Sequence, residues 1–271
     1  MKKFVLKTVV LLLCCGFYSC EKEVIVDLEA SKPRLVINAP LVWAKGTAGN
    51  EQSIQLSLTA SYYEPSVPKV TNATVLVTDE QGGSYAFLQE GTPGTYVCHN
   101  FVPVLHRKYF LEVQYNGAVY QGEEILYPVV DFDSTSQTND GGINGDEVTV
   151  KAFFTDPLAE DNYYLSKKVA PTQVIPEYSS FTDTFFEGNQ VFDAFGDADL
   201  APADAVTFTL YGISKRHHEY LVKLLNAAGA NPFQPIPGVV KGNMLNVTQA
   251  QNYPLGYFSL SQTATITHTV E

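Results

Sequence analysis

Residues 108–125 read KYFLEVQYNGAVYQGEEI, and this stretch decides the fold class. Over its first eight positions, apolar residues recur at every second position on one side, Tyr109, Leu111 and Val113, which is the pattern of a half-buried strand. The next two residues, Asn116-Gly117, tolerate the two positive φ angles of a type I′ turn. A second alternating run follows the turn. The stretch therefore predicts a β-hairpin whose inward face carries Tyr109, Leu111 and Val113.

The same alternation recurs upstream of this hairpin. Further short runs with period two cover residues 35–38, 54–59, 73–78, 84–89 and 94–98. Turn-forming residues separate them, including Asp79-Glu-Gln-Gly-Gly and Gly91-Thr-Pro-Gly. Short strands punctuated in this way predict an immunoglobulin-like or transthyretin-like β-sandwich over residues 33–130.

Residues 131–271 predict a second, β-rich domain with one amphipathic helix. A polar, turn-rich segment over 127–145 marks the boundary, and the strands resume afterwards. Ser214 is suited to cap a helix over 215–228, and Gly229 to end it in a left-handed conformation. The expected strands cover residues 148–154, 163–169, 206–213 and 256–270. The expected apolar stripe of the helix consists of Tyr220, Leu221, Leu224, Leu225 and Ala228.

The N-terminus has the pattern of a secretory signal. Two lysines precede an apolar stretch from Phe4 to Phe17, which is too short to span a membrane as a helix. Ser19 and Cys20 then resemble the cleavage site of bacterial lipoproteins, whose new N-terminal cysteine is acylated. We therefore expect a signal peptide over 1–19, lipidation at Cys20 and a lipidated tether over 20–32. A plain secretory signal and an uncleaved anchor are the alternatives.

Charge and cysteines narrow the function classes. The chain carries 17 basic and 29 acidic residues, a net charge of −12, which is the wrong sign for binding nucleic acid. It is also the wrong sign for adsorption to anionic lipid, so membrane attachment is expected through N-terminal acyl chains. Beyond the signal only Cys20 and Cys98 remain, and an acylated Cys20 cannot form a disulfide. Cys98 is expected to be a buried, inert thiol.

No catalytic, metal-binding or cofactor-binding set emerges from the motifs. The segment Asp140–Lys151 partly matches a calcium loop but lacks the acidic residue at position twelve, which favours a polar turn. The histidines lack zinc-ligand spacing, and hydrolase and phosphate-loop signatures are absent from the sequence. An acidic stretch over 187–204 leaves calcium binding open: Glu187, Asp193, Asp197, Asp199 and Asp204.

Several segments together resemble a lipoprotein family known only as domain of unknown function 4249. They include Cys20-Glu-Lys-Glu, Tyr109-Phe-Leu-Glu-Val, Asp131-Phe-Asp-Ser and Phe186-Glu-Gly-Asn. Near the C-terminus, Pro254-Leu-Gly-Tyr-Phe is the most specific. The resemblance implies a periplasmic or surface-facing outer-membrane lipoprotein of Gram-negative bacteria, often associated with TonB-dependent transporters. It carries no established activity and no catalytic residues.

The favoured hypothesis is a non-enzymatic accessory lipoprotein that binds a partner at the outer membrane, such as a transporter. The rivals are an envelope hydrolase acting on polysaccharide or peptide and a structural or adhesive surface protein. The segment Phe181–Asp204, expected to be a loop rich in phenylalanine, is the candidate partner surface, with Phe186 and Phe192 as its anchors. The alternative is that these side chains complete the core of the second domain.

Overall fold

The computed structural model describes residues 32–61, 64–158, 160–229 and 239–271. Residues 33–271 form one compact unit. The expected signal peptide, the lipidation site Cys20 and the tether up to residue 31 lie outside the described residues. These parts of the sequence prediction therefore stay predictions.

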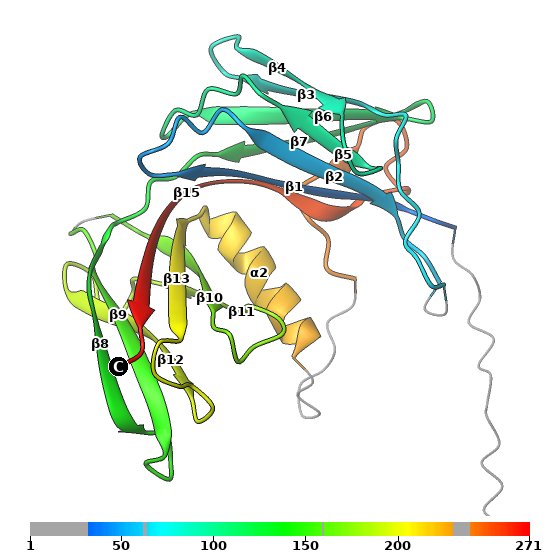
Figure 1. The fold of residues 1–271 in the computed structure, drawn as a ribbon. Helices are drawn as coiled ribbons and strands as arrows, with labels where there is room; N and C mark the ends of the chain where they lie inside the picture. The colour runs from blue at the N-terminus through cyan, green and yellow to red at the C-terminus, as the bar shows by residue number, and fades with distance from the viewer. Residues whose placement is uncertain (1–31, 62–63, 159, 230–238) are drawn as a thin grey trace, which may run out of the picture. The chain divides into compact units, whose positions relative to one another are not determined.

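The described chain is built mainly of strands (Figure 1). Those of the first half are β1 (Leu35–Ala44), β2 (Gln52–Leu58), β3 (Thr74–Asp79), β4 (Ser84–Gln89), β5 (Thr95–Cys98), β6 (Lys108–Tyr115) and β7 (Ala118–Ile125). Those of the second half are β8 (Phe132–Gly141), β9 (Glu147–Thr155), β10 (Tyr163–Val169), β11 (Glu177–Thr182), β12 (Gln190–Asp197), β13 (Ala205–Gly212), β14 (Leu245–Asn246) and β15 (Leu255–Thr269). The helix α2 (Lys215–Ala228) lies between β13 and β14.

The first half is a β-sandwich, as the alternation predicts. One layer contains β1, β2 and β5, and the other contains β3, β6, β7 and β14. Strand β4 joins them, because its first residues pair with β3 and its last residues with β5. Tyr109, Leu111 and Val113 are all buried in the core between the layers, and so is Cys98. Asn116 and Gly117 take φ angles of 48° and 75°, which confirms the predicted hairpin turn.

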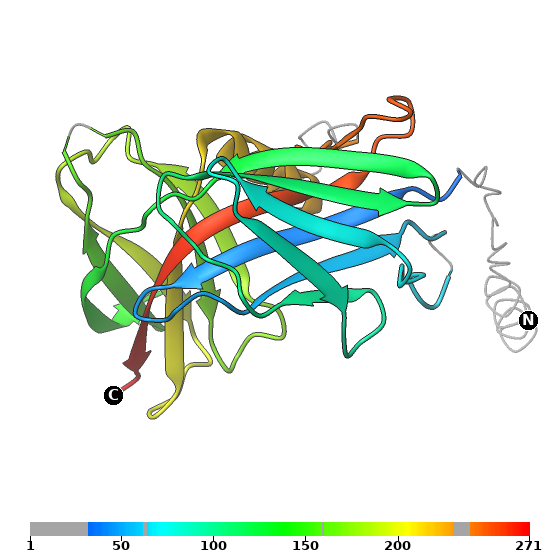
Figure 2. The ribbon, with the colours of Figure 1, turned by 90° about the horizontal axis from the view of Figure 1, so that it is seen from above.

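The long strand β15 belongs to both halves of the fold. Residues Leu255–Thr263 run parallel to β1 and supply Phe258 and Leu260 to the core of the sandwich. The rest of the strand pairs antiparallel with β13 in the second half. Figure 2 shows β15 running from one half to the other. A division of the chain at residue 130 stays a prediction, and the pairing adds that the C-terminal strand completes the N-terminal sandwich.

The second half is also layered. The sheet formed by β11, β10, β13 and the end of β15 faces a three-stranded sheet in the order β12-β9-β8. Phe208 of β13 and Val150 of β9 share one buried cluster, and Leu210 and Phe154 share a second. This part confirms the prediction of a β-rich region with one helix.

Helix α2 begins where the sequence predicts, because the side chain of Ser214 accepts a hydrogen bond from the main-chain N–H of His217. Its end differs. Gly229 has φ −75° and ψ 114°, so the predicted left-handed cap is wrong, although its N–H still donates to the Leu225 carbonyl at 2.8 Å. The predicted apolar stripe is only partly covered, since Leu224 is exposed. The helix instead buries His217.

Two sequence predictions for the second half are corrected by the structure. The segment 127–145 is not only a turn-rich boundary, because most of it is strand β8, paired with β9. The segment Phe181–Asp204 is not one continuous loop, because it contains the end of β11 and all of β12, with loops before and after β12. Strands β8 and β11 contain no buried residue and β12 contains only Phe195, so a hydrophobic pattern does not reveal these strands.

Candidate functional site

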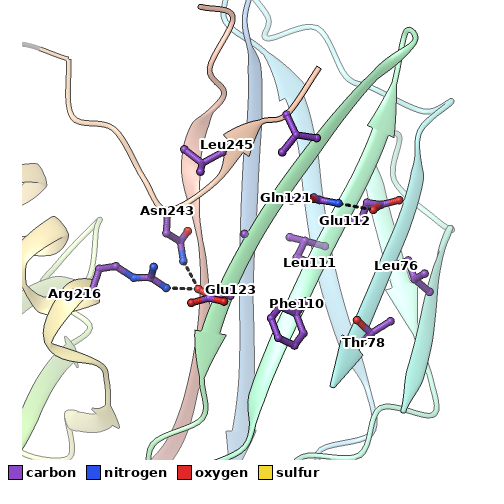
Figure 3. A pocket seen from close by; sticks show the side chains of 12 residues that line it. Leu76, Thr78, Phe110, Leu111, Glu112, Gln121, Glu123, Arg216, Asn243 and Leu245 are labelled. Carbon is purple, nitrogen blue, oxygen red and sulfur yellow. Dashed lines mark hydrogen bonds between the residues drawn. The ribbon is translucent and has the colours of Figure 1, made fainter. Parts of the chain in front are cut away.

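A groove with a volume of about 570 Å³ lies on the outer face of the sandwich (Figure 3). Its outward side chains come from β3, β6 and β7, because every second residue of these strands faces away from the core. We call it the sheet groove. Its lining includes the apolar side chains of Leu76, Phe110 and Leu245 and the polar side chains of Glu112, Gln121, Asn243 and Arg216.

Glu112 provides a fixed negative charge in the sheet groove. The side-chain amide of Gln114 donates to one carboxylate oxygen at 2.8 Å, and that of Gln121 donates to the other at 2.9 Å. These hydrogen bonds, that from Gln114 first, hold the pKa of Glu112 below its usual value. A carboxylate with a lowered pKa suits a hydrogen-bond acceptor or a counter-ion rather than a proton donor at neutral pH.

Helix α2 closes one side of the sheet groove. Arg216 and Asn243 both donate to the main-chain carbonyl of Glu123, the amide of Asn243 at 3.3 Å (Figure 3). Arg216 also lies 3.7 Å from the carboxylate of Glu124, which is buried below the groove. Glu124 accepts a 2.9 Å hydrogen bond from the hydroxyl of Tyr257, and its burial raises its pKa. These contacts tie β7 to α2 and β15.

A second, smaller hollow gathers both phenylalanines of the sequence prediction. It has a volume of about 370 Å³ and is lined by Phe181, Phe186, Gln190, Val191 and Phe192. Phe186 comes from the loop after β11 and Phe192 from β12. We call these five residues, together with the neighbouring Phe185, the aromatic surface.

The three phenylalanines at 185, 186 and 192 have different surroundings. Phe186 is half-buried and its ring lies 6.4 Å from the buried ring of Phe154, so it supports the core, as the alternative interpretation holds. Phe192 is 50% exposed, with the Lys151 ammonium 4.5 Å from its ring centroid. Phe185 is 96% exposed. The aromatic surface therefore has a half-buried base and an exposed rim.

The acidic residues of 187–204 face separate partners. Asp193 accepts hydrogen bonds from the Ser166 hydroxyl and, at 3.2 Å, from the Lys168 ammonium. Asp197 accepts from the Thr172 hydroxyl at 2.7 Å. Across the described ranges, no group of three or more His, Cys, Asp or Glu side chains is placed to hold a metal ion. In the same ranges, no helix has the length and apolar character needed to cross a membrane.

The sheet groove is a feature that the sequence prediction missed. Its lining comes from residues between 76 and 247, far apart in the chain. The only local signal is that Phe110 and Glu112 occupy the outward positions of a predicted strand. Nothing in the sequence places Arg216 or Asn243 beside them.

Comparison with known proteins gives one assignment. A profile described as "Domain of unknown function (DUF4249)" matches residues 21–267, nearly the whole chain. The chain belongs to this family. The DUF4249 match confirms the family resemblance, and it begins at the residue after Cys20. No curated protein matches the chain.

Three solved structures that resemble this DUF4249 chain share only a distant likeness with it. A two-domain fibronectin type III segment of chicken tenascin has 9% identity and a TM-score of 0.22, over 67% of this chain and 91% of the other. A cytokine receptor complex has 10% identity and a TM-score of 0.27, over 67% and 86%. A DUF4785 family protein from Legionella pneumophila subsp. pneumophila str. Philadelphia 1 has 11% identity and a TM-score of 0.28, over 66% and 52%. None of these carries an inference about function.

Proposed function

We propose that this DUF4249 protein is a non-enzymatic accessory lipoprotein of the Gram-negative outer membrane that binds a partner protein of the envelope. Its anchor is the acylated Cys20, and its partner is a component of a TonB-dependent transporter system. The signal pattern before Cys20 and the family resemblance support the location. The aromatic surface supports the binding role.

The observation that carries the proposal is the exposure of Phe185 and Phe192 beside the hollow. A phenylalanine that is 96% exposed contributes nothing to the core, and Phe192 presents half of its surface to solvent in the same region. Large apolar side chains gathered at the surface are typical of protein interfaces. Aromatic anchors at the centre of an interface contribute about 2 kcal/mol or more each to binding. The hollow beside them offers space for an apolar side chain of the partner.

Co-purification from detergent-solubilised membranes tests the aromatic surface. We expect Phe185→Ser with Phe192→Ser to lose the co-purifying outer-membrane protein while the protein stays folded, with only a small fall in melting temperature, because Phe185 is 96% exposed and Phe192 loses only surface contacts with Phe153 and Lys151. The matched control is Val174→Ser, since Val174 is 100% exposed and lies in the turn at the other end of the β10–β11 hairpin. The control should retain the partner. Retention of the partner by the double variant would contradict the proposal.

Lipid labelling tests the anchor separately. We expect the wild-type protein to incorporate a fatty-acid label and the Cys20→Ala variant to lose it and to leave the membrane fraction or stay unprocessed. An unlabelled wild type with unchanged membrane partitioning of the variant would refute lipidation at Cys20.

A further inference from the structure

Two cations converge on one aromatic ring at the start of the compact unit. The guanidinium of Arg34 lies 4.1 Å from the ring centroid of Tyr253, and the ammonium of Lys241 lies 4.0 Å from the same centroid. We call these three residues the cation clamp. Each cation gains from the electron-rich ring faces. Two positive charges therefore lie close together at the Tyr253 ring, which carries no negative charge to neutralise them.

The cation clamp is held in place by the turn between β14 and β15. Arg34 donates to the main-chain carbonyls of Gln251 and Tyr253, both at 3.4 Å. Within the turn, the Asn246 side chain donates to the Asn252 carbonyl at 2.9 Å and accepts from the Gln249 N–H at 2.8 Å. The hydrogen bonds of the turn therefore fix the positions of the Tyr253 ring and the Arg34 side chain.

No carboxylate among the described residues forms an ion pair with Arg34 or Lys241. Other basic side chains do have such partners: Lys45, Arg107, Lys108 and Arg216 have one each, and Lys168 has two. Within the described part of the chain, the cation clamp thus presents positive charge without a carboxylate partner, and an anionic partner would complement it.

The place of the cation clamp in the chain indicates which anion it meets. Arg34 is the second residue of the compact unit, so the chain from Cys20 joins the fold here. Residues 21–32 can span at most about 40 Å, which keeps this point near the membrane when Cys20 is acylated. Figures 1 and 2 both show the β14–β15 turn beside the start of β1. Val239, two residues before Lys241, is an exposed apolar residue next to the clamp in sequence.

We propose that the cation clamp docks on the phosphate groups of anionic lipids in the membrane that carries the anchor, and so orients residues 33–271. The inference rests on the proposed function only in its use of the Cys20 anchor. Basic residues beside exposed apolar ones are typical of protein surfaces that lie at a lipid headgroup layer. The net charge of −12 excludes general adsorption but not a local contact of this kind.

Vesicle sedimentation tests the docking without the acyl chains. The protein is the non-acylated chain from residue 21, which contains the family match and all buried core residues of the described ranges. We expect it to bind vesicles of phosphatidylethanolamine with 30% phosphatidylglycerol more tightly than vesicles of phosphatidylethanolamine alone, and to release in high salt. Arg34→Gln with Lys241→Gln should weaken binding about 30-fold, because each basic residue near an anionic surface contributes a factor of about five.

The matched control is Lys215→Gln with Lys223→Gln, which makes the same charge change at exposed positions on α2. It should bind like the wild type. Lys241→Gln alone, which leaves the hydrogen bonds of Arg34 intact, should weaken binding about fivefold with an unchanged melting temperature. An equal loss in the α2 control would overturn the proposal, and so would equal binding to both vesicles. Release by millimolar inorganic phosphate at constant ionic strength would assign the clamp to a soluble anion instead. No partner protein is present, so these outcomes are independent of the co-purification result.

Discussion

The fold strongly changes the chemistry of His217, which is buried beside Tyr257. Its ring is stacked on that of Tyr257, with centroids 4.6 Å apart and planes 14° apart. Burial, with smaller contributions from the charges of Arg216 and His218, lowers the pKa of His217 to about 4. Glu124 lies in the same cluster, and its burial raises its pKa. In the sequence His217 stands next to His218. In the fold it is thus a neutral part of the contact between α2 and β15.

The pKa of His217 makes stability depend on pH. The unfolded chain binds a proton at His217 near pH 6.5, whereas the folded chain resists it down to about pH 4. The contribution of neutral His217 to the free energy of unfolding is therefore present above pH 6.5 and is lost as the pH falls towards 4. A shift of this size corresponds to about 3 kcal/mol. The wild type should lose stability between pH 7 and pH 4.5, measured by urea unfolding. We expect His217→Phe, which keeps a stacked ring, to lose less over the same range, by up to about 3 kcal/mol.

The comparison of wild type and His217→Phe isolates this effect from Glu124. Glu124 acts in the opposite direction, since a carboxyl with a raised pKa loses stability as the pH rises above its unfolded value. Both proteins retain Glu124, so its effect cancels in the difference. Parallel pH profiles for the two proteins would show that His217 does not titrate as described.

At the scale of elements, the pairing of β1 with β15 depends on one glycine. Gly256 has a φ of +90°, and a Cβ added there would lie 2.1 Å from the carbonyl oxygen of Ile37, its register partner in β1. Both the backbone conformation and the close approach require glycine. The parallel contact between the first and last strands is therefore possible only with glycine at this position.

We expect Gly256→Ala to lower the free energy of unfolding by about 3 kcal/mol or more, because the backbone strain and the clash with β1 add. Gly82 is the matched control. It has the same φ of +90° in the β3–β4 turn, with nothing within 4 Å of its added Cβ. Gly82→Ala should cost only the conformational strain, about 1–2 kcal/mol. Chemical denaturation measures both, and equal losses would contradict the importance of the β1–β15 approach.

The elements also show what the sequence can predict. The hairpin of β6 and β7 follows from the sequence because its turn and its alternation agree locally. Strand β8 does not, because residues such as Asp133 and Ser134 are exposed and the strand exists through its pairing with β9. Gly229 is an expected left-handed residue, yet its backbone stays extended.

The candidate site was predictable only where its residues are close together in the sequence. Phe186 and Phe192 are close in sequence and line one hollow. However, only the fold distinguishes the ring that supports Phe154 from the one that faces solvent. The sheet groove and the cation clamp depend on contacts between residues far apart in the chain, such as Arg216 with Glu123, 93 positions apart, and Arg34 with Tyr253, 219 positions apart, which no local pattern reveals.

At the scale of the whole molecule, β15 makes the two halves depend on each other. It supplies Phe258 and Leu260 to the core of the sandwich, while Ala264 lies in a core of the second half. Loss of this strand would open both cores. We therefore expect residues 33–271 to unfold in a single transition by calorimetry, with equal calorimetric and van't Hoff enthalpies. Two resolved transitions would instead indicate that the halves fold independently.

The central claim is that the aromatic surface binds an envelope partner, and site-specific photo-crosslinking in living cells tests it most directly. A photoreactive residue at position 185 or 192 should form a discrete adduct with an outer-membrane protein, because both side chains face the proposed interface. The same residue at position 174, exposed at the other end of the β10–β11 hairpin, should not. Absence of an adduct at both 185 and 192, or the same adduct at 174, would contradict the proposed function.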